Sequence, residues 1–88
     1  MDYLHTDFWG GQDHLVVVDL DAQANVCLLS DSDFDAYRHG RSFHYYGGLA
    51  RETPVRMRPP HHGRWHVVVD LGGRCGRVRA GVRVMTMA

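Results

Sequence analysis

The chain has 88 residues, of which 44% are apolar and 23% are charged, and this is the composition of an ordinary globular protein that folds as one domain. Apolar residues nowhere run uninterrupted for the roughly 18 positions of a membrane span, so no membrane association is expected. The start, "MDYLHTDFWGG", lacks the basic and apolar regions of a signal peptide, and we therefore expect a cytoplasmic location.

The acidic and basic residues balance in number but are separated along the chain. Residues 1–37 contain eight aspartates and no arginine or lysine, whereas residues 38–88 contain all ten arginines and only two acids. Two explanations stay open. Either an arginine-rich genome encodes a fold that places the halves side by side, or the acidic face of one particle associates with the basic face of another.

The first third of the chain predicts three strands. "DYLHTDF" predicts a strand that ends at the turn "WGGQD", and "AQANVCLLS" predicts another. Between them, "HLVVVDLD" is apolar enough for a central strand buried on both faces. Cys27 lies in an apolar run, where a buried, reduced thiol is expected. Cys75 lies in a glycine-rich turn, and neither cysteine has the C-x-x-C partner of a redox motif.

The pattern then changes to a short helix near residues 31–39. Side chains that can accept hydrogen bonds from a helix start come first, namely Ser30, Asp31 and Ser32. Phe34 and Tyr37 are three residues apart and share one helix face. Gly40 follows the basic end of the segment and can supply a left-handed cap.

The second half of the chain returns to strand patterns. "SFHYYGG" predicts extended structure, "LARET" a loop, and "PVRMR", "RWHVVVDL" and "RVRAGVRVM" three more strands. In the middle one, alternation places Trp65, Val67 and Val69 in the core, and His66 and Asp70 on the other, less buried face. The outer strands direct arginines to solvent, where they form a basic patch if the strands are neighbours: Arg56, Arg58, Arg77, Arg79 and Arg83. The prediction is an all-β fold, a compact antiparallel β-sandwich or flattened barrel of about seven strands with one short helix.

No arrangement of residues marks a catalytic site. There is no nucleophile elbow and no phosphate-binding loop, and no cofactor is expected. A weak metal alternative is zinc held by His61 and His66, which "HHGRWH" brings close, with His44 reaching across the sheet. A polar turn followed by a strand explains the same residues, so no metal site is predicted.

A binding site is predicted where the helix ends. Arg38, His39 and Arg41 cluster there, and the next segment contributes His44, Tyr45 and Tyr46. Guanidinium groups bind carboxylate or phosphate, and tyrosine rings supply flat contact area. The glycines at 47 and 48 allow a backbone to approach closely. This combination suits a small anionic or ring-bearing ligand, or an acidic protein surface.

Three motifs resemble one known family. "QANV", "RHGRSFHYYGG" and "HHGRWHVVVDLGG" are similar to the bacterial family called domain of unknown function 1883, and the resemblance covers roughly residues 2–84. It implies a compact, mainly β domain. Some members are joined to Toll/interleukin-receptor-type domains, which implies a regulatory role in signalling or defence. The resemblance carries no catalytic residues over to this chain.

We therefore expect a non-catalytic module that binds a protein or a small ligand. One alternative is a small metal-dependent hydrolase that uses the histidines. Another is a structural subunit that forms a homodimer through an exposed strand edge. Nucleic acid is not expected as a partner.

Overall fold

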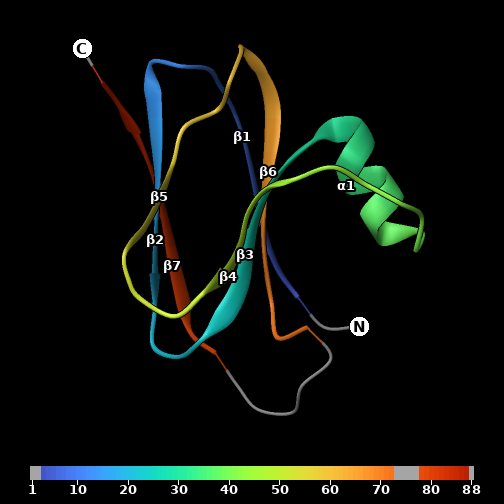
Figure 1. Cartoon of the computed structure of the whole chain (residues 1–88). Helices are drawn as coiled ribbons and strands as arrows, with labels where there is room; N and C mark the ends of the chain where they lie inside the picture. The colour runs from blue at the N-terminus through green and yellow to red at the C-terminus, as the bar shows by residue number, and fades with distance from the viewer. Residues whose placement is uncertain (1–2, 73–77, 88) are drawn as a thin grey trace.

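The structure is a computed structural model in which residues 3–72 and 78–87 are described. In these ranges the strands and the helix stack in three layers (Figure 1). A three-stranded small sheet lies on one side and a four-stranded large sheet lies in the middle. The helix packs on the large sheet's outer face, the one that faces away from the small sheet.

The described strands form two separate sheets, so the fold is the sandwich of the two architectures that the sequence left open. In order across the large sheet, the strands are β1 (Leu4–Gly10), β6 (Gly63–Asp70), β3 (Ala24–Ser30) and β4 (Tyr46–Ala50). The small sheet consists of β5 (Val55–Met57), β2 (His14–Leu20) and β7 (Ala80–Thr86). All paired strands are antiparallel, and the helix α1 (Asp31–Arg38) lies between β3 and β4 in the chain.

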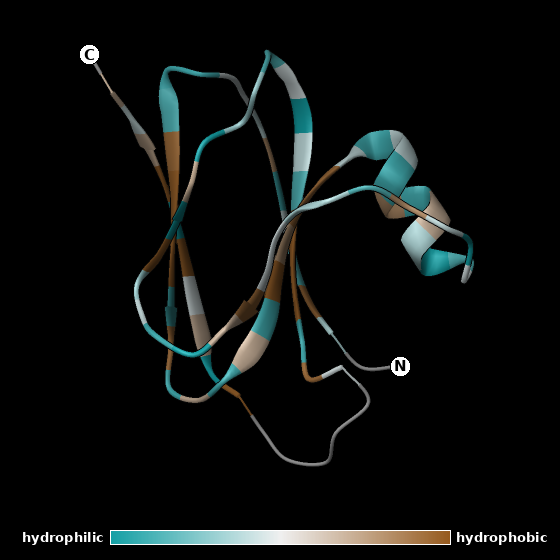
Figure 2. Ribbon diagram, in the orientation of Figure 1, coloured by the Kyte–Doolittle hydropathy of each residue, from teal (hydrophilic) through white to brown (hydrophobic). Residues whose placement is uncertain are grey.

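The main core lies between the two sheets. As predicted, Trp65, Val67 and Val69 of β6 point into it. They pack against alternate residues of β2 and β3, which are Val16, Val18, Ala24, Val26 and Leu28. All eight are at most 2% exposed, and Figure 2 shows the apolar colour in the middle of the facing strands. Each of the larger side chains contributes about 1.5–3 kcal/mol when it is fully buried.

A second core lies between the large sheet and α1. Cys27, Leu29 and Val68 pack there against Phe34 of the helix. The unbroken valine run of β6 is explained by these two apolar layers, because the strand is buried on both faces. The sequence placed His66 on the correct face, but its prediction of a less buried face is wrong, since His66 is only 3% exposed beneath the helix.

The helix begins and ends as the capping residues predicted. The Ser30 hydroxyl accepts a hydrogen bond from the backbone N–H of Asp33 at 3.3 Å. After the last turn, Gly40 adopts a φ of +70°, in the left-handed region that favours glycine. Among the described residues, no helix is long and apolar enough to cross a membrane.

The segment after the helix differs from the prediction. The sequence predicted extended structure over residues 42–48 and a loop over residues 49–53, whereas the strand β4 covers Tyr46–Ala50 and residues 41–45 are irregular. Gly47 has a φ of +104°, and a Cβ at this position would clash with the Val26 carbonyl oxygen. Only glycine therefore lets β4 pair with β3, and the close approach predicted for Gly47 is made to the chain's own backbone.

The arginines of the small sheet lie on strands that are not neighbours. The central strand β2 separates β5 from β7, and Val17 of β2 pairs in register with both Arg56 and Arg83. Arg83 contacts Asp19 at 3.3 Å. The condition for a continuous basic patch is therefore not met. Two predicted features, the turn with Cys75 and the outward Arg77, lie outside the described residues.

Candidate functional site

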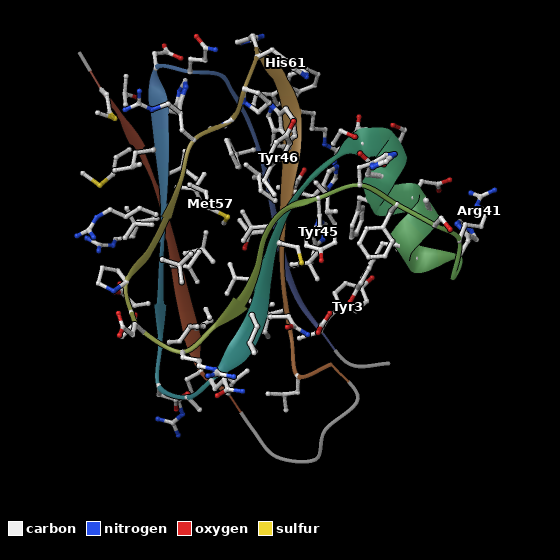
Figure 3. The ribbon with its side chains drawn as sticks, viewed as in Figure 1. Tyr3, Arg41, Tyr45, Tyr46, Met57 and His61 are labelled. Carbon is white, nitrogen blue, oxygen red and sulfur yellow. The ribbon has the colours of Figure 1, made fainter. Side chains whose placement is uncertain are left out.

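The six residues of the predicted binding site surround the end of α1 but do not form one surface. They are Arg38, His39, Arg41, His44, Tyr45 and Tyr46. Arg41 forms a salt bridge with Asp35 of the helix at 2.8 Å, and His39 Nδ1 donates to the Asp35 carbonyl at 2.7 Å. The Arg38 guanidinium lies 5.7 Å from the centre of the Phe34 ring. These basic groups contact the helix itself, and Figure 3 shows Arg41 pointing away from the sandwich.

The two neighbouring tyrosines face opposite sides of the large sheet. Tyr46 lies on the side of the main core, with its ring centre 6.1 Å from that of Trp65. Tyr45 lies on the helix side, with its ring centre 5.6 Å from that of Phe43 (Figure 3). Both are about half exposed, at 51% for Tyr45 and 52% for Tyr46. Tyr45 lines a pocket on the outer face, and His44 contributes a backbone N–H to Asp33 nearby.

That pocket has a volume of about 320 Å³ and lies beside α1 on the outer face of the large sheet. We call it the aromatic pocket. The sheet supplies its floor, the end of the helix and the irregular segment supply three rings, and β4 supplies the far side. Its lining residues are Asn25, Cys27, Tyr37, Phe43, Tyr45, Gly48, Leu49 and Asp70.

A hydrogen-bond network around Asp70 forms the polar part of the floor. The Asp70 carboxylate accepts from Asn25 Nδ2 at 3.0 Å and from the Tyr37 hydroxyl at 2.8 Å. It also accepts from the backbone N–H of Gly72 at 2.9 Å. Asp70 is 8% exposed, and each of these three donors is neutral. The network joins β3, β6 and α1, so it fixes the helix end relative to the sheet.

Three aromatic rings stand above this floor. The rings of Tyr37 and Phe43 meet edge to face, with centres 5.3 Å apart and an interplanar angle of 89°. Phe43 and Tyr45 meet at 47°. The rings thus present faces in different directions, which is the arrangement of a cage and not of a flat platform.

The charge of Asp70 influences the titratable groups around it. Burial, together with the Asp70 carboxylate, raises the pKa of the Cys27 thiol to about 11. Burial and the hydrogen bond to Asp70 raise the pKa of the Tyr37 hydroxyl well above its usual range. Near neutral pH the thiol is therefore protonated and poorly nucleophilic, and the hydroxyl remains a donor.

A second polar group lies at the other end of the helix. Asp31, at the helix start, accepts from His66 Nε2, and His66 Nδ1 lies 2.8 Å from His5 Nε2. A carboxylate can only accept, so the proton of neutral His66 is on Nε2 and its Nδ1 accepts from His5. The lone pair of neutral His5 is then on Nδ1. We call these three residues the histidine chain.

Phe34 holds the two imidazole rings in place. Its ring stacks on His5 with centres 4.2 Å apart and on His66 with centres 4.4 Å apart. Burial and the neighbouring His66 lower the pKa of His5 below its ordinary value. Asp7, on the same face of β1, is occupied by a salt bridge with Arg64 at 2.6 Å. His5 is therefore a neutral, partly accessible base near pH 7.

The histidines of the zinc alternative are not brought together. His66 belongs to the histidine chain, the ring centre of His61 lies 5.0 Å from that of Trp65, and His44 lies beyond the helix end. Across residues 3–72 and 78–87, no group of three or more histidine, cysteine or acidic side chains could hold a metal ion.

Sequence reasoning missed both the aromatic pocket and the histidine chain. Strand alternation put Asp70 on the correct face, but only the register between β3 and β6 pairs it with Asn25. His5 lies in a strand with little alternation, and its partner His66 is 61 positions away. The available signals were an acid at the end of an apolar strand and a histidine in each of two strands.

A family model described as a domain of unknown function (DUF1883) matches residues 1–88, the whole chain. The comparison with curated proteins and the comparison with solved structures each found no match. The family match agrees with the resemblance of the three sequence motifs. The bacterial distribution and the fused receptor-type domains implied by that resemblance stay predictions.

Proposed function

The chain belongs to the DUF1883 family, and we propose that it is a non-catalytic binding module whose ligand site is the aromatic pocket. The observation that carries this proposal is the combination of three aromatic rings with one buried carboxylate in a single pocket. Ligand sites are typically apolar hollows with a few converging polar groups, and about 300 Å³ is the lower end of their usual size. The pocket thus fits one ring or one head group.

The exposure of Tyr45 supports this proposal. A tyrosine that is 51% exposed contributes little to the core, yet its ring lines the pocket beside Phe43. Leu49, on the far side of the same pocket, is 50% exposed. Exposed apolar side chains that surround a hollow are typical of ligand sites.

The anionic ligand or acidic partner expected from the sequence stays a prediction, but the arrangement of charges favours it less. Arg41 is engaged by Asp35, and the pocket next to the helix end contains the Asp70 carboxylate. The homodimer and the role in signalling or defence also stay predictions.

A fragment titration followed by ¹H–¹⁵N NMR tests the proposal. Small neutral, cationic and anionic fragments are added at millimolar concentration to the labelled full chain. We expect the shifted amides to gather at Asn25, Tyr45, Gly48 and Leu49. The proposal fails if no fragment shifts these amides, or if the shifts gather at Arg38 and His39.

A second candidate function is general-base hydrolysis at His5, and the histidine chain favours it. Asp31 and His66 hold His5 in the form whose Nδ1 lone pair is available. This nitrogen could remove a proton from water as the water oxygen bonds to an ester carbonyl carbon. The ester C–O bond then breaks, the proton passes from His5 to the departing alcohol or phenol oxygen, and the carboxylic acid is released.

Hydrolysis of p-nitrophenyl acetate distinguishes this second function from background. A general base contributes about 100-fold or more, so His5→Gln should lower the rate per molecule by at least about tenfold. His62→Gln is the matched control, because His62 lies in an exposed turn outside the chain of hydrogen bonds. Equal rates for the two variants exclude catalysis at His5.

A further inference from the structure

We infer that the aromatic pocket takes the ammonium group of an organic cation, methylated or quaternary, an inference that rests on the pocket being a ligand site. Asp70 supplies the opposite charge. The rings of Tyr37, Phe43 and Tyr45 supply the surfaces around the cation.

Asp70 is a buried acid without a basic partner in the described part of the chain. The salt bridges among residues 3–72 and 78–87 do not include it, although they occupy Asp7, Asp19, Asp31 and Asp35. The three hydrogen-bond donors that the described residues supply to Asp70 are neutral, so they stabilise the carboxylate without cancelling its charge. Within residues 3–72 and 78–87 no basic side chain balances this buried carboxylate, and a cation in the adjoining pocket would balance it.

The rings next to Asp70 are the second observation. A cation is attracted to the electron-rich face of an aromatic ring, and the attraction is strongest where water is excluded. The edge-to-face contact of Tyr37 with Phe43 leaves ring faces pointing in different directions around one volume. An ammonium group inside that volume can contact more than one face at once, while the carboxylate lies on the sheet side.

Other ligand classes fit these groups less well. An anion would be repelled by Asp70. A sugar needs several hydrogen-bond donors and acceptors, but the Asn25 amide and the Tyr37 hydroxyl both donate to Asp70. A methylated ammonium carries positive charge on apolar methyl groups and needs few or no hydrogen bonds. It therefore matches a pocket of rings around a single charge.

The direct test compares choline with 3,3-dimethylbutan-1-ol, which has the same shape but no charge. Both are titrated into the labelled full chain at low salt and followed by NMR at the pocket amides. We expect choline to bind at least about tenfold more tightly than the alcohol. Equal binding of the two at the pocket overturns the cation inference and leaves the proposed function intact. Failure of every fragment, choline included, overturns both.

Two tyrosines provide matched variants. Tyr45→Ala removes a ring of the pocket, and we expect choline binding to weaken about five- to tenfold. Tyr46→Ala removes an equally exposed ring on the opposite side of the sheet, and choline binding should not change. Both side chains are half exposed, so both variants are expected to fold. Near-ultraviolet circular dichroism is the check on folding. Equal weakening in the two variants overturns the assignment.

Substitutions of opposite charge at the exposed Leu49 test whether the bound ligand is positively charged. Leu49→Glu should tighten choline binding and Leu49→Lys should weaken it, while binding of the neutral alcohol stays the same in both. Leu4→Lys is the control, since Leu4 is similarly exposed, at 45%, but does not line the pocket. If Leu49→Lys binds choline as tightly as the wild type at low salt, the inference is wrong.

Discussion

The two outer faces of the sandwich cover their strands in different ways. On the large sheet, β3 and β6 are buried on both faces because α1 packs on them and Phe34 joins the second core. On the small sheet no described helix packs, yet Val17 on its outer face is only 4% exposed. The residues in register with Val17 on both sides are Arg56 and Arg83. Their apolar stems can cover the valine while their charged ends stay in water.

The difference between cover by a helix and cover by arginine side chains explains where buried polar groups occur. A helix excludes water from the sheet beneath it, so His66 and Asp70 need partners within the protein, and both have them. Arginine stems leave the surface wet, so the acid of the small sheet, Asp19, is exposed and contacts Arg83 at the surface. The Asp70 network and the histidine chain therefore lie on the face that the helix covers.

Removal of the Phe34 ring, which packs the helix onto the large sheet, should have the largest effect on stability. Phe34→Ala deletes the ring that packs against the second core and both histidines, and we expect a loss of about 3–5 kcal/mol in the free energy of unfolding. Val17→Ala on the small sheet should cost less, about 1–2 kcal/mol. Urea unfolding of both variants measures the difference. If the two losses are equal, the helix covers the large sheet no more effectively than the arginines cover the small one.

Loss of a buried acid should have the next largest effect. Asp70→Ala leaves the donors of Asn25, Tyr37 and Gly72 without this acceptor, and an unsatisfied buried group costs about 1–3 kcal/mol. Asp19→Ala removes an exposed partner of Arg83, which should cost less than about 1 kcal/mol. Thermal unfolding of the two variants at the same pH provides the measurement. A larger loss for Asp19→Ala would contradict the contrast between a dry face and a wet face.

Two substitutions at Arg83 distinguish the stabilising effect of its apolar stem from that of its charge. Arg83→Ala uncovers Val17 and should cost about 0.5–1 kcal/mol, whereas Arg83→Met keeps an apolar stem and should stay close to the wild type. Urea unfolding in low and high salt distinguishes the two causes. If Arg83→Met is as unstable as Arg83→Ala, and salt removes the difference from wild type, the charge matters and the stem does not.

The smallest expected effect is the pH dependence due to His5. Burial and His66 lower its pKa in the folded state, so the unfolded chain binds the proton more readily. This contribution to stability is fully present above the unfolded pKa of about 6.5 and is lost as the pH falls toward the lower folded value. The other neighbours that set the shift are Asp7, Arg64 and Arg38.

His5→Gln should therefore flatten the decline in stability below about pH 6.5. Urea unfolding at several pH values from 4 to 8 measures the slope, with His62→Gln as the control. A slope in His5→Gln as steep as in the wild type would show that other groups cause the decline.

Much of the fold could be predicted from the sequence because the controlling signals are local. Alternation gave the core face of β6, and Ser30 with Gly40 gave the ends of α1. The sites could not be predicted in the same way. The contact of Asp70 with Asn25 depends on strand register, and the position of Tyr45 depends on an irregular segment that carries no periodic pattern. The burial of His66 depends on which sheet face the helix selects.

The placement of α1 between β3 and β4 has a consequence for how this domain can change. These two strands are antiparallel neighbours that a tight turn could join, but the chain instead inserts residues 31–45 between them. All three rings of the aromatic pocket lie in this insertion, and Asn25, Cys27 and Asp70 lie in the sheet. Substitutions in the insertion can therefore alter the rings without touching the main core. The sandwich is in this sense a scaffold, and the proposed ligand preference can diverge between relatives through a single exchangeable connection.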